Sequence, residues 1–150
     1  MGRSRTVVRY VNAHLAPLGE SELTSSMVSN YVKQGLIPSP IKKAYTAEHL
    51  ARLLFIAVVK PVVRLEGLRL MFGIQEDNYP LQTAYDYFCD EFENMLGAAF
   101  GIAPARAGIG KTQSDAKDLL RSTILATVNK VYLDRYLEDY QKRREKEIHR

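Results

Sequence analysis

Apolar residues recur along this chain at the three- and four-residue spacing of amphipathic helices, and prolines and glycines separate the segments that carry this pattern. In the last segment, for example, Leu120, Ile124 and Val128 follow one another at four-residue steps. Five other segments show similar spacing. The pattern therefore predicts helices at about residues 6–16, 24–35, 46–61, 65–73, 80–99 and 112–146.

The segment between the second and third expected helices does not show helical spacing. It contains Pro38 and Pro40, and it continues with Lys42 and Lys43. Proline cannot donate to a β ladder, so residues 36–45 permit at most a small, irregular two-stranded hairpin. The fold predicted from the sequence is all-α with a small β wing, in the manner of a winged helix-turn-helix followed by long helices.

The last expected helix is long for a chain of 150 residues. At 1.5 Å per residue it would extend roughly 50 Å, which is more than a domain of this size can cover. Part of it is therefore expected to pack on another copy of the chain, as a homodimer. We divide the chain into a DNA-binding head at residues 1–73 and a helical dimerisation or effector region at residues 74–150, with Gln75–Asn78 as a hinge.

Composition places the chain among ordinary globular proteins, with 46% hydrophobic and 25% charged residues. Cys89 is the one cysteine, so no intramolecular disulfide can form, and a reducing, cytoplasmic location is expected. The longest apolar run, Leu53–Val59, is far shorter than the roughly 20 residues that cross a bilayer. We therefore expect neither a secreted protein held together by disulfides nor a membrane-spanning protein.

Charge is distributed unevenly. Residues 1–64 carry nine Lys or Arg and three Asp or Glu, whereas residues 65–100 carry one and seven, and residues 101–150 carry eleven and seven. A basic first half could attract a polyanion, and an acidic middle would repel one.

The second expected helix has an unusual polar face. Opposite its apolar stripe it carries side chains that are short or basic and never acidic: Ser25, Ser26, Ser29, Asn30, Lys33 and Gln34. Serine and asparagine are poor helix formers, so their grouping on one face indicates a use other than solvation. Such side chains allow close approach to the DNA major groove, with Lys42 and Lys43 beside it. The alternative is a helix-turn-helix that serves only as a protein-interaction or adaptor module.

The run from Leu23 to Pro38, followed by Lys42, Lys43, Ala44, Tyr45 and a helix, resembles the head of MerR-type transcription regulators. It is more similar still to a bacterial domain-of-unknown-function family, DUF1836, which shares this head and continues with an aromatic helix. The resemblance covers roughly residues 7–100. It implies a DNA-binding transcription regulator.

By this resemblance Lys43 and Tyr45 would form the wing tip and its base, and these residues would face DNA: Ser25, Ser26, Ser29, Asn30 and Lys33. MerR-type regulators usually carry arginine at the positions of Ser29 and Lys43, so the phosphate contacts should be weaker or differently arranged here. Lysine keeps the charge of arginine without its bidentate fork. No effector is implied.

Other motifs in the sequence give weaker evidence of function. Gly110-Lys111-Thr112 ends like a phosphate-binding loop, but alanine stands at position 105, where that motif needs its first glycine. The three histidines are scattered without metal-binding spacing, and Cys89 is expected to be an inert, buried thiol. No nucleophile, base and orienting group converge on one loop, so we expect no enzyme activity, metal or cofactor.

Overall fold

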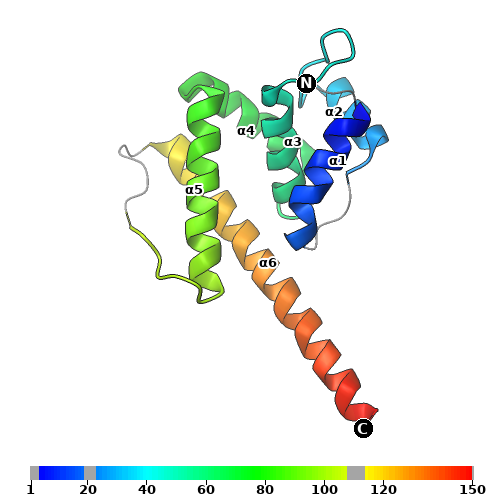
Figure 1. The fold of residues 1–150 in the computed structure, drawn as a ribbon. Helices are drawn as coiled ribbons and strands as arrows, with labels where there is room; N and C mark the ends of the chain where they lie inside the picture. Colours follow the sequence, from blue (N-terminus) through cyan, green and yellow to red (C-terminus); the bar gives the residue numbers. More distant parts are fainter. Residues whose placement is uncertain (1–3, 19–22, 108–113, 150) are drawn as a thin grey trace. The chain divides into compact units, whose positions relative to one another are not determined.

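The computed structural model describes residues 4–18, 23–107 and 114–149, and this part of the chain is helical (Figure 1). The elements in chain order are α1 (Ser4–Leu15), the short 3-10 helix η1 (Ala16–Leu18), α2 (Ser25–Lys33), α3 (Ala47–Val59), α4 (Leu65–Asn78), α5 (Leu81–Ala99) and α6 (Asp115–Ile148). The all-α class predicted from the apolar spacing is confirmed.

The prediction of a small β wing is wrong. The described residues contain no strand, and segment 36–45 is an irregular loop with one isolated bridge between Ile41 and Ala44. Pro38 and Pro40 lack the N–H donors of a ladder, and side chains from α3 hold this loop in place of cross-strand hydrogen bonds. The winged form of the helix-turn-helix is therefore absent.

The chain divides into two compact units, Met1–Tyr85 and Asp86–Arg150. The sequence had suggested a boundary at residue 73 with a hinge at Gln75–Asn78. Those hinge residues instead continue α4, because Gly73 lies inside the helix without ending it. Below, unit 1 denotes the first of these parts and unit 2 the second.

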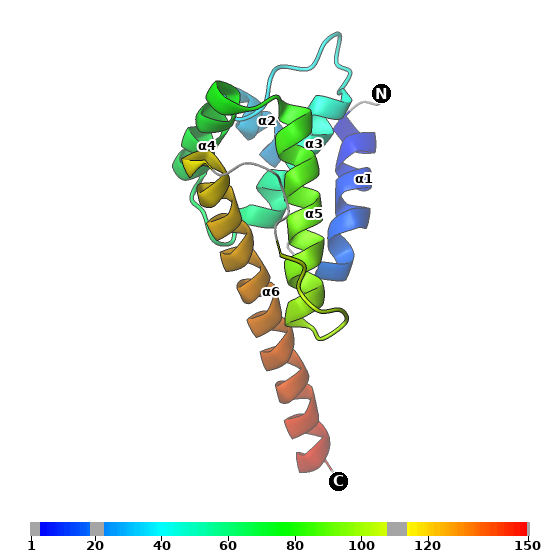
Figure 2. The same ribbon diagram turned by 90° about the vertical axis from the view of Figure 1, so that its left-hand side faces the viewer.

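In unit 1, α1 packs against both α2 and α3 (Figures 1 and 2). Each helix turns its apolar stripe inward, as the spacing predicts. Their buried side chains include Val7, Val11, Leu15, Val28, Tyr31, Leu53 and Ile56. This core fixes the orientation of α2, so the opposite face of α2 must point outward.

Polar contacts set where α2 begins and ends. The Asn12 side chain donates to the Leu23 carbonyl oxygen at 2.9 Å and accepts from the Leu23 N–H at 2.7 Å. Thr24 is the N-cap, and its hydroxyl accepts from the Met27 N–H at 3.2 Å. Gly35 follows the helix with φ of 75°, a conformation that glycine adopts without strain.

Unit 2 contains most of α5 and all of α6. Ser114 caps α6 by accepting from the Lys117 N–H at 3.1 Å. The aromatic rings of Phe100 and Tyr132 lie 5.5 Å apart, which places the end of α5 beside α6. The first half of α6 buries three apolar residues on one face: Ile124, Val128 and Val131.

The loop after α5 is held by one amide. Asn94 donates to the Arg106 carbonyl oxygen at 2.9 Å and accepts from the Arg106 N–H at 2.6 Å. The same Asn94 amide nitrogen donates to the Glu91 carboxylate at 3.0 Å. Both side chains are buried, so this loop has a defined path.

Candidate nucleic-acid interface

The outer face of α2 forms an exposed polar surface. Residues from three successive turns line an open hollow of about 340 Å³: Ser25, Ser26, Ser29, Asn30 and Lys33. All five are exposed, and the helix buries Val28 and Tyr31 on its other side. The structure thus brings together on one surface the five α2 residues that the sequence selected. We call these five residues the α2 face.

Contacts within the α2 face are local and exposed. The Asn30 side-chain oxygen accepts from the Gln34 amide at 3.2 Å, and the Ser4 hydroxyl on α1 donates to the Ser25 hydroxyl at 3.3 Å. Because these pairs are exposed, a ligand can replace them at little cost. Burial beneath this face raises the pKa of Tyr31, so its phenol stays neutral and adds no negative charge.

Lys42 and Lys43 form the tip of the loop that projects between α2 and α3 (Figure 2). The flanking residues Ile41 and Ala44 exchange backbone hydrogen bonds of 3.1 and 2.8 Å, which closes a two-residue turn. Both lysines have a left-handed backbone conformation, with φ of 51° and 63°. Asparagine or glycine would adopt this conformation with less strain, so the side chains are retained against a backbone cost. We call this feature the lysine turn.

Tyr45 is placed differently from the other selected residues. Its side chain is buried, and its ring packs edge-on against the His49 ring with centroids 5.1 Å apart. A buried ring supports the base of the loop from below. Among the described residues, the candidate surface for a ligand therefore consists of the α2 face and the lysine turn, without the Tyr45 ring.

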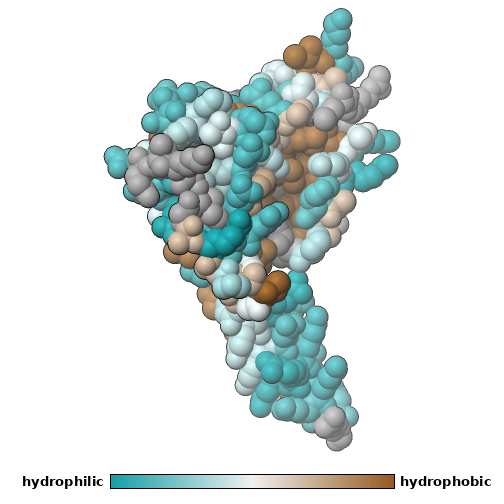
Figure 3. Space-filling view, turned by 60° about the vertical axis from the view of Figure 1, so that its left-hand side comes forward, coloured by the Kyte–Doolittle hydropathy of each residue, from teal (hydrophilic) through white to brown (hydrophobic). Residues whose placement is uncertain are grey.

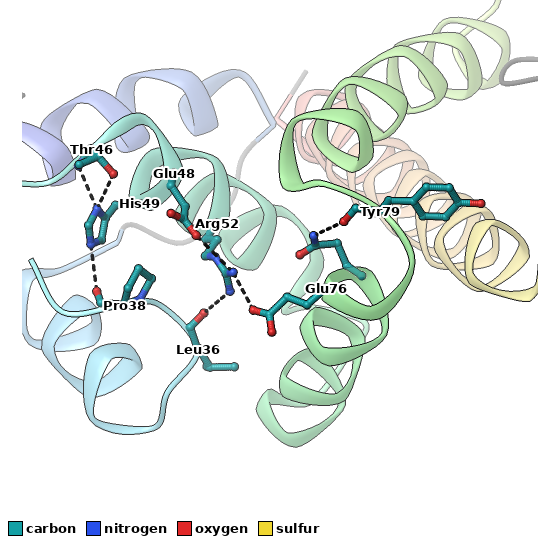
Figure 4. Close-up of polar contacts among 9 residues, drawn as sticks. Leu36, Pro38, Thr46, Glu48, His49, Arg52, Glu76 and Tyr79 are labelled. Carbon is teal, nitrogen blue, oxygen red and sulfur yellow. Dashed lines mark hydrogen bonds and ion pairs between the residues drawn. The ribbon is translucent and has the colours of Figure 1, made fainter.

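His49 attaches both ends of this loop to α3 (Figure 4). Its Nδ1 atom accepts a hydrogen bond from the Thr46 N–H at 2.9 Å, and its Nε2 atom lies 2.9 Å from the Pro38 carbonyl oxygen. The two contacts require a neutral ring with its proton on Nε2. Since only 2% of His49 is exposed, the ring forms a rigid connection between the start and the end of the loop.

Arg52 lies one helical turn further along α3 and holds the first residue of the loop (Figure 4). Its guanidinium donates to the Leu36 carbonyl oxygen at 3.3 Å and pairs with Glu48 at 3.4 Å and with Glu76 of α4 at 3.0 Å. It also lies over the Phe72 ring, 4.8 Å from the centroid. Two half-exposed carboxylates thus pair with one nearly buried guanidinium.

The sequence analysis did not identify the roles of His49 and Arg52. The sequence shows no metal-binding spacing around His49, and the structure shows that this residue caps α3 in place of the usual Glu or Gln. Its second contact, with Pro38, and the contact of Arg52 with Glu76 join residues far apart in the chain. A buried arginine in the apolar segment Leu50–Val59 was the one available signal, since such a residue needs partners.

Comparison with known proteins gives a match to one protein family. The model of a domain-of-unknown-function family, DUF1836, matches residues 5–88. The chain belongs to this family. The DUF1836 match covers α1 to α4, and so it includes the α2 face and the lysine turn. No curated protein and no solved structure matches the chain, so the resemblance to MerR-type regulators gains no support from these comparisons.

The other sequence features of this DUF1836 chain lie outside the α2 face and the lysine turn. The Gly110-Lys111-Thr112 motif lies outside the described residues. Cys89 is half-buried on α5. Across the described ranges, no group of three or more His, Cys, Asp or Glu side chains is arranged to hold a metal ion. Nor does any helix there combine the length and the apolar character needed to cross a membrane.

Proposed function

We propose that this chain binds double-stranded DNA through the α2 face and the lysine turn, and that it regulates transcription. The observation that carries the proposal is the α2 face itself: three serines, an asparagine and a lysine share one exposed surface without an acidic residue. DNA carries a dense row of phosphates, so a carboxylate on this surface would be repelled.

The two parts of the surface have different roles in the proposal. Short hydroxyl and amide side chains let α2 lie deep in the major groove, where Asn30 can bond to the edge of an adenine. The lysine turn holds two ammonium groups at the end of a loop that starts where α2 ends, and it contacts backbone phosphates. His49 and Arg52 hold that loop in place, which lowers the entropy lost on binding.

The alternative is an interaction module that binds an acidic protein. The lysine turn would suit such a partner as well, because it contributes charge without sequence information. The α2 face separates the two functions, since serine and asparagine side chains are hydrogen-bonding groups that read base edges.

Salt-dependent binding to duplex DNA tests the proposal. We expect affinity to fall with salt at a log-log slope of about −0.9 per phosphate contact. Lys42→Ala with Lys43→Ala should weaken binding to all duplexes alike and make the slope shallower by about two. Arg64→Ala with Arg69→Ala is the matched control, because it also removes two positive charges from exposed residues. Arg64 is the N-cap of α4, and Arg69 lies within that helix.

Selection from random duplexes tests the α2 face. Asn30→Ala should change the selected sequence without changing the salt slope, whereas the lysine variant should leave the selected sequence unchanged. Equal binding by the wild type and all variants, or no binding that depends on salt, would reject DNA binding and leave the interaction module.

A further inference from the structure

The second half of α6 is exposed along its whole length. Every residue from Tyr132 to His149 is exposed, although the preceding turns bury Val128 and Val131. This half still carries large apolar side chains: Tyr132, Leu133, Tyr136, Leu137, Tyr140 and Ile148. Leu133 is 54% exposed and Leu137 is 61% exposed.

These side chains are not scattered around the helix. Leu133, Tyr136 and Tyr140 follow one another at steps of three and four residues and so share one face. At 100° per residue this face points away from the one that buries Val128 and Val131. The rings of Tyr132 and Tyr136 lie 6.2 Å apart, so the aromatic surface is continuous along the helix. We call Tyr132, Leu133, Tyr136, Leu137 and Tyr140 the α6 stripe.

A helix with such a stripe requires a partner. Most helical stability in proteins comes from packing an amphipathic face, and a regular apolar stripe on a helix is typical of helix pairing. In the space-filling view of Figure 3, the distal part of α6 is coloured mainly from teal to white, so polar groups dominate the face in view. The polar residues that surround the stripe therefore decide what kind of partner it accepts.

Charges along this half of α6 are ordered in two blocks. Residues 134–139 contain three acidic residues and one basic residue, whereas residues 142–146 contain four basic residues and one acidic residue. Packed side by side in the same direction, two copies would place like blocks together. Packed in opposite directions, they place the acidic block of each copy beside the basic block of the other.

We infer that the α6 stripe binds a second copy of this chain, with the two α6 helices antiparallel and crossing near Tyr140. A symmetric dimer needs a surface that is complementary to itself, and the block order along α6 meets that requirement. The inference does not depend on DNA binding, because it concerns residues of unit 2 alone.

The mass of the full chain in solution is the first test. We expect twice the 17.0 kDa of one chain. Leu133→Gln with Leu137→Gln should weaken dimerisation by about a thousandfold or more, because the dimer loses four leucine contacts, two from each copy. Ser122→Gln with Asn129→Gln is the control: it changes two exposed residues of α6 that lie outside the stripe and outside both charge blocks, and it should leave the dimer intact.

Circular dichroism should show that both variants keep their helix content, because glutamine is a good helix former. A wild type that stays monomeric at high concentration would overturn the inference. So would a leucine variant that stays as dimeric as the wild type.

Charge reversal tests the order of the blocks. Asp134→Lys should weaken the dimer, because antiparallel helices that cross at Tyr140 place position 134 of one copy opposite position 146 of the other. Adding Lys146→Asp should restore the dimer, because the two exchanged charges then face each other. If the second change weakens the dimer further, the antiparallel order is wrong.

Disulfide trapping tests the direction separately, in a chain with Cys89→Ser. Tyr140→Cys lies near the crossing point and should trap a covalent dimer. Leu133→Cys should not, because antiparallel helices hold these two positions apart. Rapid trapping by Leu133→Cys and not by Tyr140→Cys would overturn the antiparallel arrangement.

Discussion

Both units of the molecule hold an irregular loop with buried polar side chains from a helix, but they use different chemistry. In unit 1 a guanidinium and an imidazole, Arg52 and His49, bind the loop 36–46. In unit 2 one neutral amide, Asn94, binds the loop after α5. The comparison shows that the guanidinium and the imidazole support the loop that presents lysines, and that the amide supports a loop that presents apolar groups such as Ile102, which is 80% exposed.

The difference also concerns how many elements each arrangement joins. Arg52 connects α3, the loop and α4, because it pairs with Glu76 while it donates to Leu36. Asn94 connects only its own helix and the loop around Arg106. Loss of Arg52 should therefore cost more than loss of Asn94, and each loss should affect its own unit.

The largest expected effect is that of Arg52→Ala. It removes the hydrogen bond to Leu36 and the packing on Phe72, and we expect the free energy of unfolding to fall by about 3 kcal/mol. Denaturant unfolding gives the size, and hydrogen exchange should show the loss of protection in α3 and α4. Arg69→Ala is the control, since its ion pair with Glu66 is exposed and should contribute under about 1 kcal/mol.

Asn94→Ala should have the next largest effect, about 2 kcal/mol, because it leaves both backbone groups of Arg106 without their partner. Hydrogen exchange should locate this loss in unit 2. Asn78→Ala removes a single exposed hydrogen bond to Ile74 and serves as the comparison. If Asn94→Ala proves more damaging than Arg52→Ala, the ranking of the two arrangements is incorrect.

The sequence predicted the elements whose evidence is local. The apolar spacing located α1, α2, α3 and α6. The exposed α2 face also followed from spacing, because a helix with one buried face must expose the other. Its ligand stays a prediction.

What the sequence missed depends on contacts between distant residues. Segment 36–45 could be interpreted as a hairpin because its turn is local, but its path depends on His49 and Arg52. The left-handed conformation of Lys42 and Lys43 could not be foreseen either, since lysine rarely adopts it. The role of Asn94 likewise depends on a partner twelve residues away.

A smaller effect, of opposite sign, is expected from Lys42→Asn with Lys43→Gly. Asn-Gly is the preferred pair for a two-residue turn with two positive φ angles, so the variant should be more stable by about 1 kcal/mol. The same variant should bind DNA more weakly under the proposed function. Thermal unfolding and a DNA titration of one sample measure both. Lower stability would show that the lysine side chains contribute contacts to the fold.

The smallest expected effect is a pH dependence in unit 2. Burial, with the Glu91 carboxylate as the second cause, raises the pKa of Tyr87 from 10.0 to about 12. Between these values the unfolded chain loses the Tyr87 proton and the folded chain keeps it, so stability should fall as pH rises from 10 to 12. Tyr87→Phe should make this fall shallower in unfolding measurements across that range. An unchanged profile would contradict the assignment.

The two contacts of His49 have a consequence for how this loop can vary. One imidazole spans the carbonyl of Pro38 and the amide of Thr46, so the separation of the two loop ends is fixed while the identity of the residues between them is not. A deletion that leaves the loop too short would strain these contacts, whereas replacement of the tip would not. Residues 39–44 could therefore be exchanged for another six-residue tip, which would let one scaffold recognise different ligands.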